Sequence, residues 1–478
     1  MPRFLWVFIV SLALAACNQQ TTTETPNDGS QPSVVSFSLL DTKTNKPLES
    51  FGVLSAGATV ELANLPEAVS LRANTNPETV GGVAFDFGGS LYVDTTAPYT
   101  LSAQNGWTPL LDATVTATAL AKDGSSGASR SLTFGKAAVN DGLNHYLYVF
   151  RPSAIDVFDI DRNHKKVKSL KLPRGIDRIW GATAHAASHM LYISYHDHDA
   201  KGYERGLLKY DLVAEKIVWK HLYQPFVDSP AITADGKTIF MSSGEATNRG
   251  SFWFVINTAD GSVTDKIEVY RGSHNTIIGL SGKRVYLGSV RYPYLVVADT
   301  TTHNIVKKIG PFRDGVRPFT VNGKETLAFV NVNRFLGFEV GDIASGKVLY
   351  SVRVKGFQEG PFSSPLAVQS HGVALTPDEK EVWVVDGKNS CVHLYDVTGL
   401  PGKAPVYLRS IKLPSRPLWV QFSRDGRFAY TSGGDVISAK TKQVVGKTSS
   451  AKVRIQIDFK GNVPVNAYVR YGLGYVTN

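Results

Sequence analysis

Residues 371–385 read HGVALTPDEKEVWVV and contain the pattern that decides the fold. A short apolar run leads into a polar turn, and a second apolar run follows the turn at once, as in paired antiparallel strands. The same kind of turn recurs around Gly236, Gly282, Gly323 and Gly426, with Glu379 at the equivalent position of this copy. These positions are separated by 46, 41, 56 and 47 residues. Such a period predicts β-propeller blades of about four strands each.

The repeats extend from Lys136 to Asn478, a length of 343 residues that gives about seven blades. The first strand pair, residues 146–149 and 155–158, lacks an innermost strand of its own. Residues 452–459 can supply that strand, close the ring and remove an exposed sheet edge. We therefore predict a propeller over residues 136–478.

The repeats lack the paired Gly-His and Trp-Asp signature of WD40 blades. They resemble the YVTN class of bacterial propellers, for which residues 371–378 closely match the blade opening. The chain also ends Tyr475-Val476-Thr477-Asn478. This resemblance implies the fold and leaves the activity open, because propellers serve as binders, scaffolds and enzymes.

Residues 34–134 show shorter period-two runs between Asn, Pro and Gly residues. They predict about seven antiparallel strands of a sandwich with one solvent-facing side, which is the size of an immunoglobulin-like module. Residues 72–99 also resemble Ig-like modules of secreted bacterial polysaccharide-active proteins. The segment has no His and no Cys, so we expect a spacer or accessory role. The predicted class is all-β: an Ig-like β-sandwich followed by a propeller of about seven four-stranded blades.

Residues 1–16 read MPRFLWVFIVSLALAA, which is typical of a secretory signal peptide and too short for a membrane span. Residues 14–17 resemble the lipobox of bacterial lipoproteins, which implies that Cys17 is lipidated and becomes the mature N-terminus. A signal peptide with an accidental cysteine is the alternative. Residues 17–33 are polar and predict a flexible tether. Because Asn18 stands where inner-membrane lipoproteins carry Asp, the resemblance favours the outer membrane or surface of a bacterial cell envelope.

The charge of the chain is divided unevenly. Residues 18–134 hold 5 basic and 11 acidic side chains, whereas residues 135–478 hold 45 and 30. A basic propeller predicts an anionic partner, such as a polysaccharide or a cell-surface partner. Few aromatic residues alternate with the charges, which argues against nucleic acid. Two cysteines exclude a disulfide framework and thiolate clusters, and the sequence has no P-loop, dinucleotide fingerprint or serine elbow.

In a propeller, the starts of the innermost strands and the loops between second and third strands lie on one face, around the channel. Four histidines are predicted to lie there: His196, His198, His274 and His371. His196 and His198 can chelate a divalent metal with His274, but so few ligands do not favour a metal, and no cofactor is assigned. The predicted ligand-binding residues on this face are Arg178, Asp228, Asn275, Arg291, Arg334 and Arg416.

Two functions fit this face, and the sequence leaves open whether the protein is an enzyme. The first is a lipid-anchored propeller that binds an anionic ligand at its channel mouth. The second is a polysaccharide lyase that cleaves uronate-containing glycans by β-elimination, since several uronate lyase families have propellers with similar residues. In that case Arg317 would neutralise the carboxylate, and His274 or His371 would act as the base. Tyr292 or the other histidine would then protonate the leaving oxygen.

Overall fold

The computed structural model describes residues 31–61, 65–66, 68–87, 90–105, 107, 109, 113–135, 141–173, 176–197, 204–245, 251–364, 367–468 and 474–476. Within these ranges the chain forms 38 strands and three short 3-10 helices, which confirms the predicted all-β class. No helix in the described ranges is both long enough and apolar enough to cross a membrane.

The N-terminal strands form a barrel-like sandwich of two layers. One layer contains β1 (Ser33–Asp41), β2 (Val53–Leu54), β4 (Val69–Asn76) and β7 (Thr100–Leu101). The other contains β3 (Thr59–Glu61), β5 (Gly82–Phe87), β6 (Ser90–Asp94), β8 (Ala113–Leu120) and β9 (Ser126–Gly135). A single parallel pairing of Ser33 with Ala128 joins them into one nine-stranded sheet. The two additional strands over the predicted seven arise because β2 and β7 have two residues each, too few for a period.

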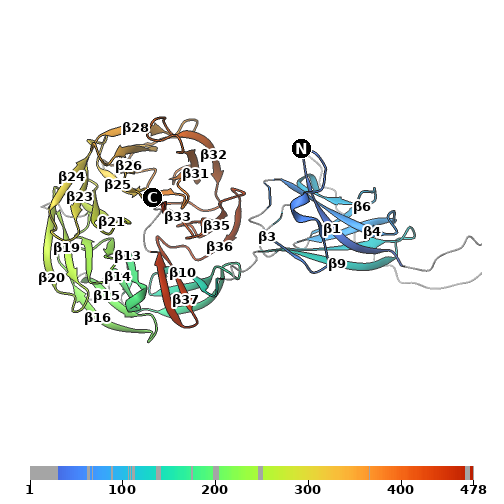
Figure 1. Ribbon diagram of the computed structural model, residues 1–478, viewed down its shortest axis with the longest axis horizontal. Coiled ribbons are helices and arrows are strands. Elements are labelled where there is room, and N and C mark those ends of the chain that lie inside the picture. Colours follow the sequence, from blue (N-terminus) through green and yellow to red (C-terminus); the bar gives the residue numbers. More distant parts are fainter. Residues whose placement is uncertain are drawn as a thin grey trace, which may run out of the picture.

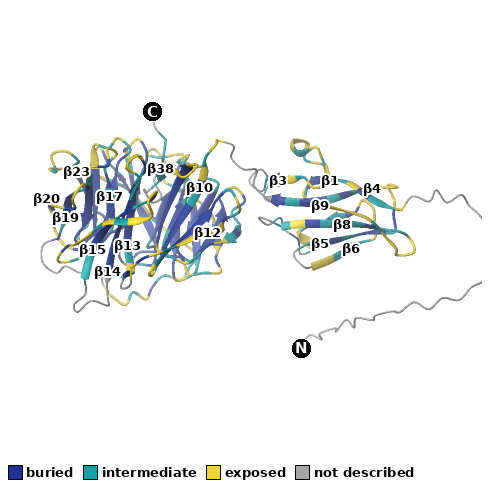
Figure 2. Ribbon diagram, turned by 90° about the horizontal axis from the view of Figure 1, so that it is seen from below, coloured by how far each residue is buried: buried dark blue, intermediate teal, exposed yellow. Residues whose placement is uncertain are grey.

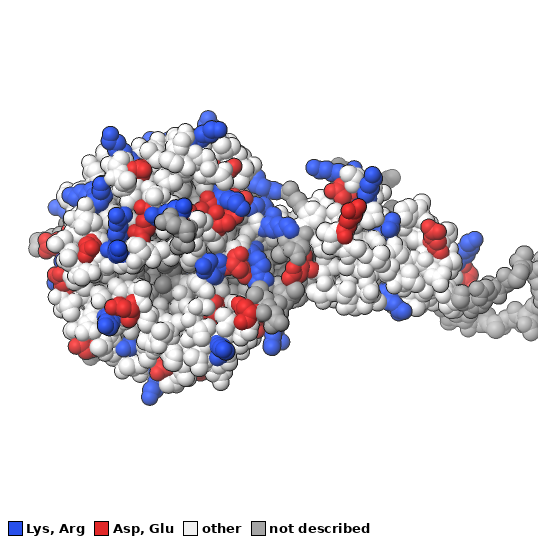
Figure 3. Space-filling model, in the orientation of Figure 1, with Lys and Arg blue, Asp and Glu red and all other residues white. Residues whose placement is uncertain are grey.

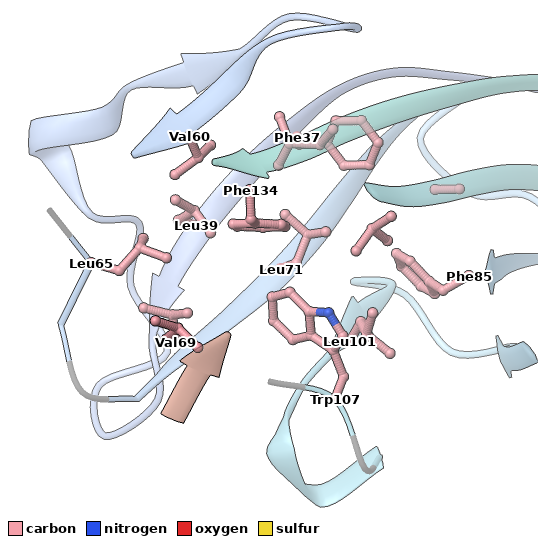
Figure 4. Close-up of a cluster of buried hydrophobic side chains, with 14 of the residues drawn as sticks. Phe37, Leu39, Val60, Leu65, Val69, Leu71, Phe85, Leu101, Trp107 and Phe134 are labelled. Carbon is pink, nitrogen blue, oxygen red and sulfur yellow. The ribbon is translucent and has the colours of Figure 1, made fainter. Parts of the chain in front are cut away.

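The core of this sandwich is aromatic and aliphatic (Figure 4). Trp107 lies edge-on to Phe134, with ring centroids 5.5 Å apart, and Phe37 and Phe85 are fully buried near them. Alternate residues of β8 are buried, as expected for a strand with one core-facing side.

Seven four-stranded blades follow the sandwich and form a ring (Figure 1). The first complete blade consists of β13 (Ile176–His185), β14 (Met190–Asp197), β15 (Glu204–Asp211) and β16 (Lys216–Leu222). The second consists of β17 (Pro230–Ile232), β18 (Thr238–Ser242), β19 (Ser251–Asn257) and β20 (Val263–Val269). The third consists of β21 (Ser273–Ile278), β22 (Arg284–Ser289), β23 (Leu295–Asp299) and β24 (Ile305–Ile309). The fourth consists of β25 (Val316–Val321), β26 (Leu327–Val332), β27 (Gly337–Asp342) and β28 (Val348–Arg353). The fifth consists of β29 (Val373–Leu375), β30 (Glu381–Asp386), β31 (Cys391–Asp396) and β32 (Val406–Lys412). The sixth consists of β33 (Val420–Phe422), β34 (Phe428–Thr431), β35 (Asp435–Ser438) and β36 (Val444–Lys447). We number these blades 2 to 7.

Blade 1 closes the ring by joining both ends of the propeller chain. It combines β37 (Val453–Lys460) with β10 (Asn144–Arg151), β11 (Ala154–Asp159) and β12 (Lys165–Lys171). β37 pairs with β10 along its length, for example Ile455 with Tyr148, which confirms the predicted closure. In Figure 1 the red β37 lies beside the blue-green β10. An unpredicted fifth strand, β38 (Val463–Tyr468), pairs with the free side of β37.

The last described residues lie across the turn face of the propeller. Val476 donates its N–H to Glu379 Oε1 at 3.1 Å, and Gly323 donates to the same oxygen at 2.6 Å. The Arg424 guanidinium lies 4.0 Å from the centroid of the Tyr475 ring. These contacts tie the tail to the turns of blades 5, 6 and 7, so any ligand site at the start of the inner strands lies on the opposite face. Figure 2 shows that the blade strands are largely buried and the turns exposed.

Candidate functional site

A cavity of about 510 Å³ lies on the face where the sequence predicts a ligand site, among the starts of the inner strands. Six of the seven blades contribute to its wall. Its lining residues are Phe150, Pro152, Asp177, Arg178, Ile179, Trp180, Asp228, Ser229, Glu245, His274, Asn275, His371, Trp419, Ala451, Lys452 and Val453. The predicted residues Arg178, Asp228, His274, Asn275 and His371 are therefore brought together in one cavity.

Irregular strand pairing places several of these side chains. The register of β21 against β22 shifts between Ser273 and Thr276, which takes His274 and Asn275 out of the ladder. β25 shifts in the same way around Arg317. A β-bulge bends a strand and redirects the side chains of its extra residues, and such bulges are common beside functional sites. The bulges thus turn residues of the inner strands towards the channel.

A buried histidine–aspartate pair lies at one side of the cavity. His274 and Asp228 are 5% and 2% exposed, and His274 Nδ1 is 2.8 Å from Asp228 Oδ2. Burial opposes protonation of His274, but the charges of Asp228 and Glu245 outweigh it and raise the pKa of His274 above its ordinary value. Burial also raises the pKa of Asp228, so the two side chains share a proton, and the raised pKa of His274 favours Nδ1–H donating to Asp228.

His371 lies beside this pair, and its pKa is shifted in the opposite direction, which favours a neutral ring. Its ring centroid is 5.8 Å from that of His274 and 4.9 Å from that of Trp419. Burial, together with the positive charges of His274, Arg317 and Lys452, lowers the pKa of His371 well below its ordinary value. Two neighbouring histidines whose pKa values move apart supply a proton donor and a proton acceptor at one place.

Four buried polar atoms of the cavity lining have no hydrogen-bond partner in the described part of the chain. They are Trp180 Nε1, His274 Nε2, Asn275 Oδ1 and His371 Nδ1. Buried polar atoms are nearly always paired, and each unpaired atom costs about 1–3 kcal/mol. They come from blades 2, 4 and 6 around the cavity, and a polar ligand with both donors and acceptors would satisfy them.

Arg317 supports the cavity rather than lining it. Its side chain is buried, with NH1 2.8 Å from Glu245 Oε2 and Nε 2.7 Å from Asn333 Oδ1. Burial would raise the pKa of Glu245, but His274 and Arg317 lower it below its ordinary value. Glu245 is therefore ionised, and its negative charge helps to raise the pKa of His274. Arg317 was predicted to neutralise the carboxylate of a substrate, but its contacts with Glu245 and Asn333 favour a supporting role.

The mouth of the cavity carries cations beside aromatic rings. Arg178 and Lys452 are exposed, whereas Trp180 and Trp419 are half-buried. Lys452 Nζ lies 5.8 Å from the Trp180 ring centroid. Sequence reasoning missed both tryptophans, although each follows a predicted blade opening by two or three residues. It also missed Lys452 and assigned no role to Glu245.

Four other predicted residues lie elsewhere on the propeller. Tyr292 packs against Tyr270 and Tyr294, with ring centroids 5.5 and 5.1 Å away. Arg334 is paired with Asp314 at 2.7 Å. Arg291 and Arg416 are exposed and, like Tyr292 and Arg334, are not among the residues that line the cavity.

The predicted metal ligands do not form a recognisable centre. His196 is buried between Trp180 and Phe226, with ring centroids 4.9 and 4.3 Å away. His198 and the predicted lipidation site Cys17 lie outside the described residues. Among the residues that the structure describes, no group of three or more His, Cys, Asp or Glu side chains is arranged to hold a metal ion.

The positive charge of the propeller lies mainly on its outer rim. The outermost strands of the seven blades contain 13 basic and 2 acidic residues. Lysines on edge strands prevent edge-to-edge association between molecules, which explains most of this excess without a ligand. On the propeller face seen in Figure 3, basic and acidic side chains are interspersed. The net charge therefore carries less weight for an anionic ligand than the local groups at the cavity.

Comparisons with known proteins add no family to this description. No protein-family model matches the sequence, and no curated protein matches it. The function must therefore be argued from the cavity.

Proposed function

We propose that the protein binds an acidic glycan in the cavity at the mouth of its propeller channel. The observation that carries this proposal is the set of unpaired buried polar atoms beside the His274–Asp228 pair and two tryptophans. A pocket that is mostly apolar with a few convergent polar groups is the usual form of a small-ligand site.

The chemistry of the wall favours a uronate over a neutral sugar. His274, Arg178 and Lys452 can each donate a charge-assisted hydrogen bond to a carboxylate. Trp180 and Trp419 offer flat apolar surfaces for the faces of a sugar ring. Asn275 and Asp177 provide acceptors for its hydroxyl groups.

The test is calorimetric titration with digalacturonate and its neutral counterpart, digalactose. We expect digalacturonate to bind at least tenfold more tightly, since charge-assisted hydrogen bonds are worth about 1.5–3 kcal/mol. His274→Asn should remove most of this preference. Equal binding of the two sugars, or no binding of either, would contradict the proposal.

A lyase is the second candidate, and the opposed pKa shifts of His274 and His371 favour it. Neutral His371 would take the proton at C5 of the uronate, next to the carboxylate. The electron pair would form the C4–C5 double bond as the C4–O bond breaks, and His274 would donate a proton to the leaving oxygen. The product absorbs ultraviolet light. Binding of polygalacturonate without any rise in absorbance would exclude this reaction for that substrate.

The setting of this site in the cell is also part of the proposal. A lipid on Cys17 would hold the protein at the bacterial envelope, and the sandwich would act as a spacer below a YVTN-type propeller. Labelling of cells with a palmitate analogue tests the anchor: wild-type protein should be labelled, and Cys17→Ala should not.

A further inference from the structure

A strip of three tyrosines lies on the same face as the cavity, at the edge of blade 4. Tyr270 lies in the loop before β21, and Tyr292 and Tyr294 lie in the loop between β22 and β23. The ring centroids of Tyr270 and Tyr292 are 5.5 Å apart, and those of Tyr292 and Tyr294 are 5.1 Å apart. We call these three residues the tyrosine strip.

The strip is both held in place and open to solvent. Tyr292 packs on the hydrophobic core shared by blades 3 and 4, so the middle ring is fixed. Tyr270 is 59% exposed, which makes it the most exposed aromatic side chain in the described part of the chain. An exposed aromatic ring loses favourable burial, so a cluster of tilted rings with Tyr270 open to solvent on the cavity's face indicates an interaction surface.

Cations flank the strip. The Arg271 guanidinium lies 5.7 Å from the Tyr270 ring centroid, and Lys308 Nζ lies 5.8 Å from that of Tyr292. Arg291 is exposed next to Tyr292. Within the described ranges, no carboxylate forms an ion pair with Arg271, Arg291 or Lys308. The strip thus combines flat apolar faces with unneutralised positive charge.

The strip is close to the cavity along the chain. Tyr270 precedes His274 by four residues, so their Cα atoms are at most roughly 14 Å apart. Both lie on the channel-mouth side of blade 4, where β21 begins. A glycan chain of a few residues can cover this distance.

We infer that the tyrosine strip is an outer subsite for the same acidic glycan, so that the ligand is a polymer that extends from the cavity over blade 4. This inference rests on the proposed function. Sugar rings would stack on the tyrosines while Arg271, Arg291 and Lys308 pair with successive carboxylates. The strip would then give the protein a preference for long chains.

The experiment compares digalacturonate with decagalacturonate on Tyr270→Ala, with Tyr407→Ala as the control. Tyr407 is also an exposed tyrosine, but it lies on β32 of blade 6. We expect Tyr270→Ala to weaken decagalacturonate binding about three- to tenfold and to leave digalacturonate binding unchanged. Tyr407→Ala should change neither.

Three results would overturn the inference: unchanged decagalacturonate binding in Tyr270→Ala, equal weakening of both sugars, or equal tyrosine-dependent binding of poly-glutamate, which has charge but no sugar rings. The proposed function fails separately. If His274→Asn leaves decagalacturonate binding intact while Tyr270→Ala abolishes it, the strip is the site and the cavity is not. If the wild-type protein binds neither sugar, both proposals fall.

Discussion

Asp228→Asn separates the charge of the cavity from its shape. In the native protein the Asp228 carboxylate accepts a hydrogen bond from His274 Nδ1 at 2.8 Å, and both side chains are buried. Asparagine has nearly the same size and its amide oxygen can accept the same bond. Without the carboxylate, however, only Glu245 still favours the protonated form, against burial and the charge of Arg317, so the pKa of His274 should fall. Neutral His274 then presents a lone pair at Nε2 where it previously presented a proton.

The expected loss follows from that single atom. A hydrogen bond from a charged donor is worth about 1.5–3 kcal/mol, so digalacturonate binding at pH 7 should weaken about 10- to 100-fold. The free energy of unfolding should change little, because His274 loses its proton and no unpaired buried charge remains. Binding by the wild-type protein should also weaken as the pH rises through the raised pKa of His274. Above that pH the two proteins should converge.

The assay combines calorimetric titration with an NMR pH titration of the imidazole signals. Asp265→Asn is the control, because it removes a similar contact, 2.7 Å from His303 Nδ1, at the surface and away from the cavity. Affinity of Asp228→Asn within twofold of wild type at pH 7 would refute the reasoning. So would an unchanged pKa of His274 in that variant.

Three other substitutions test the electrostatics of the fold. Glu245→Gln removes the carboxylate that neutralises the buried Arg317 cation and should cost about 3–5 kcal/mol in urea unfolding. Burial lowers the pKa of His164 to about 3, so its stabilising effect is complete above pH 6.5 and falls as the pH drops; His164→Asn should remove about 2–3 kcal/mol of the stability difference between pH 7 and pH 4.5. Burial alone would raise the pKa of Asp156, but its hydrogen bonds, chiefly from Arg151, lower it to about 2; Asp156→Asn should therefore cost about 2 kcal/mol at pH 7 and almost nothing at pH 2, by the same measurement.

The ring could be predicted from the sequence because its signal is periodic. Each turn, such as the one at Gly236 or Gly426, repeats a short-range rule, and several copies reinforce one another. Closure by β37 also followed from a local fact, the missing partner of β10. β38 could not be predicted in this way, since its place depends on the free side of a strand that is itself paired only through closure.

Some of the predicted site residues line the cavity and others do not, and this difference has a physical reason. His274 and His371 open inner strands, so the repeat itself places them at the channel mouth. Tyr292 occupies an equally suitable loop, yet it packs against Tyr270 and Tyr294 at the edge of blade 4. Which way a side chain turns depends on bulges and on neighbouring blades, and neither leaves a periodic trace in the sequence.

The net positive charge of the propeller was counted correctly, but its location does not support the anionic ligand that was predicted from it. The excess of basic residues predicted an anionic ligand at the channel, but most of that excess lies on the outer strands, where it protects exposed edges. Lysines on the rim would attract any polyanion weakly. Salt at about 0.1 M screens this attraction over a distance of about 10 Å. A ligand held at His274 and the tryptophans would resist salt far better, because those groups are buried or half-buried. The inference of an anionic ligand therefore rests on His274, Arg178 and Lys452 at the cavity, and the net charge of the chain is evidence neither for nor against it.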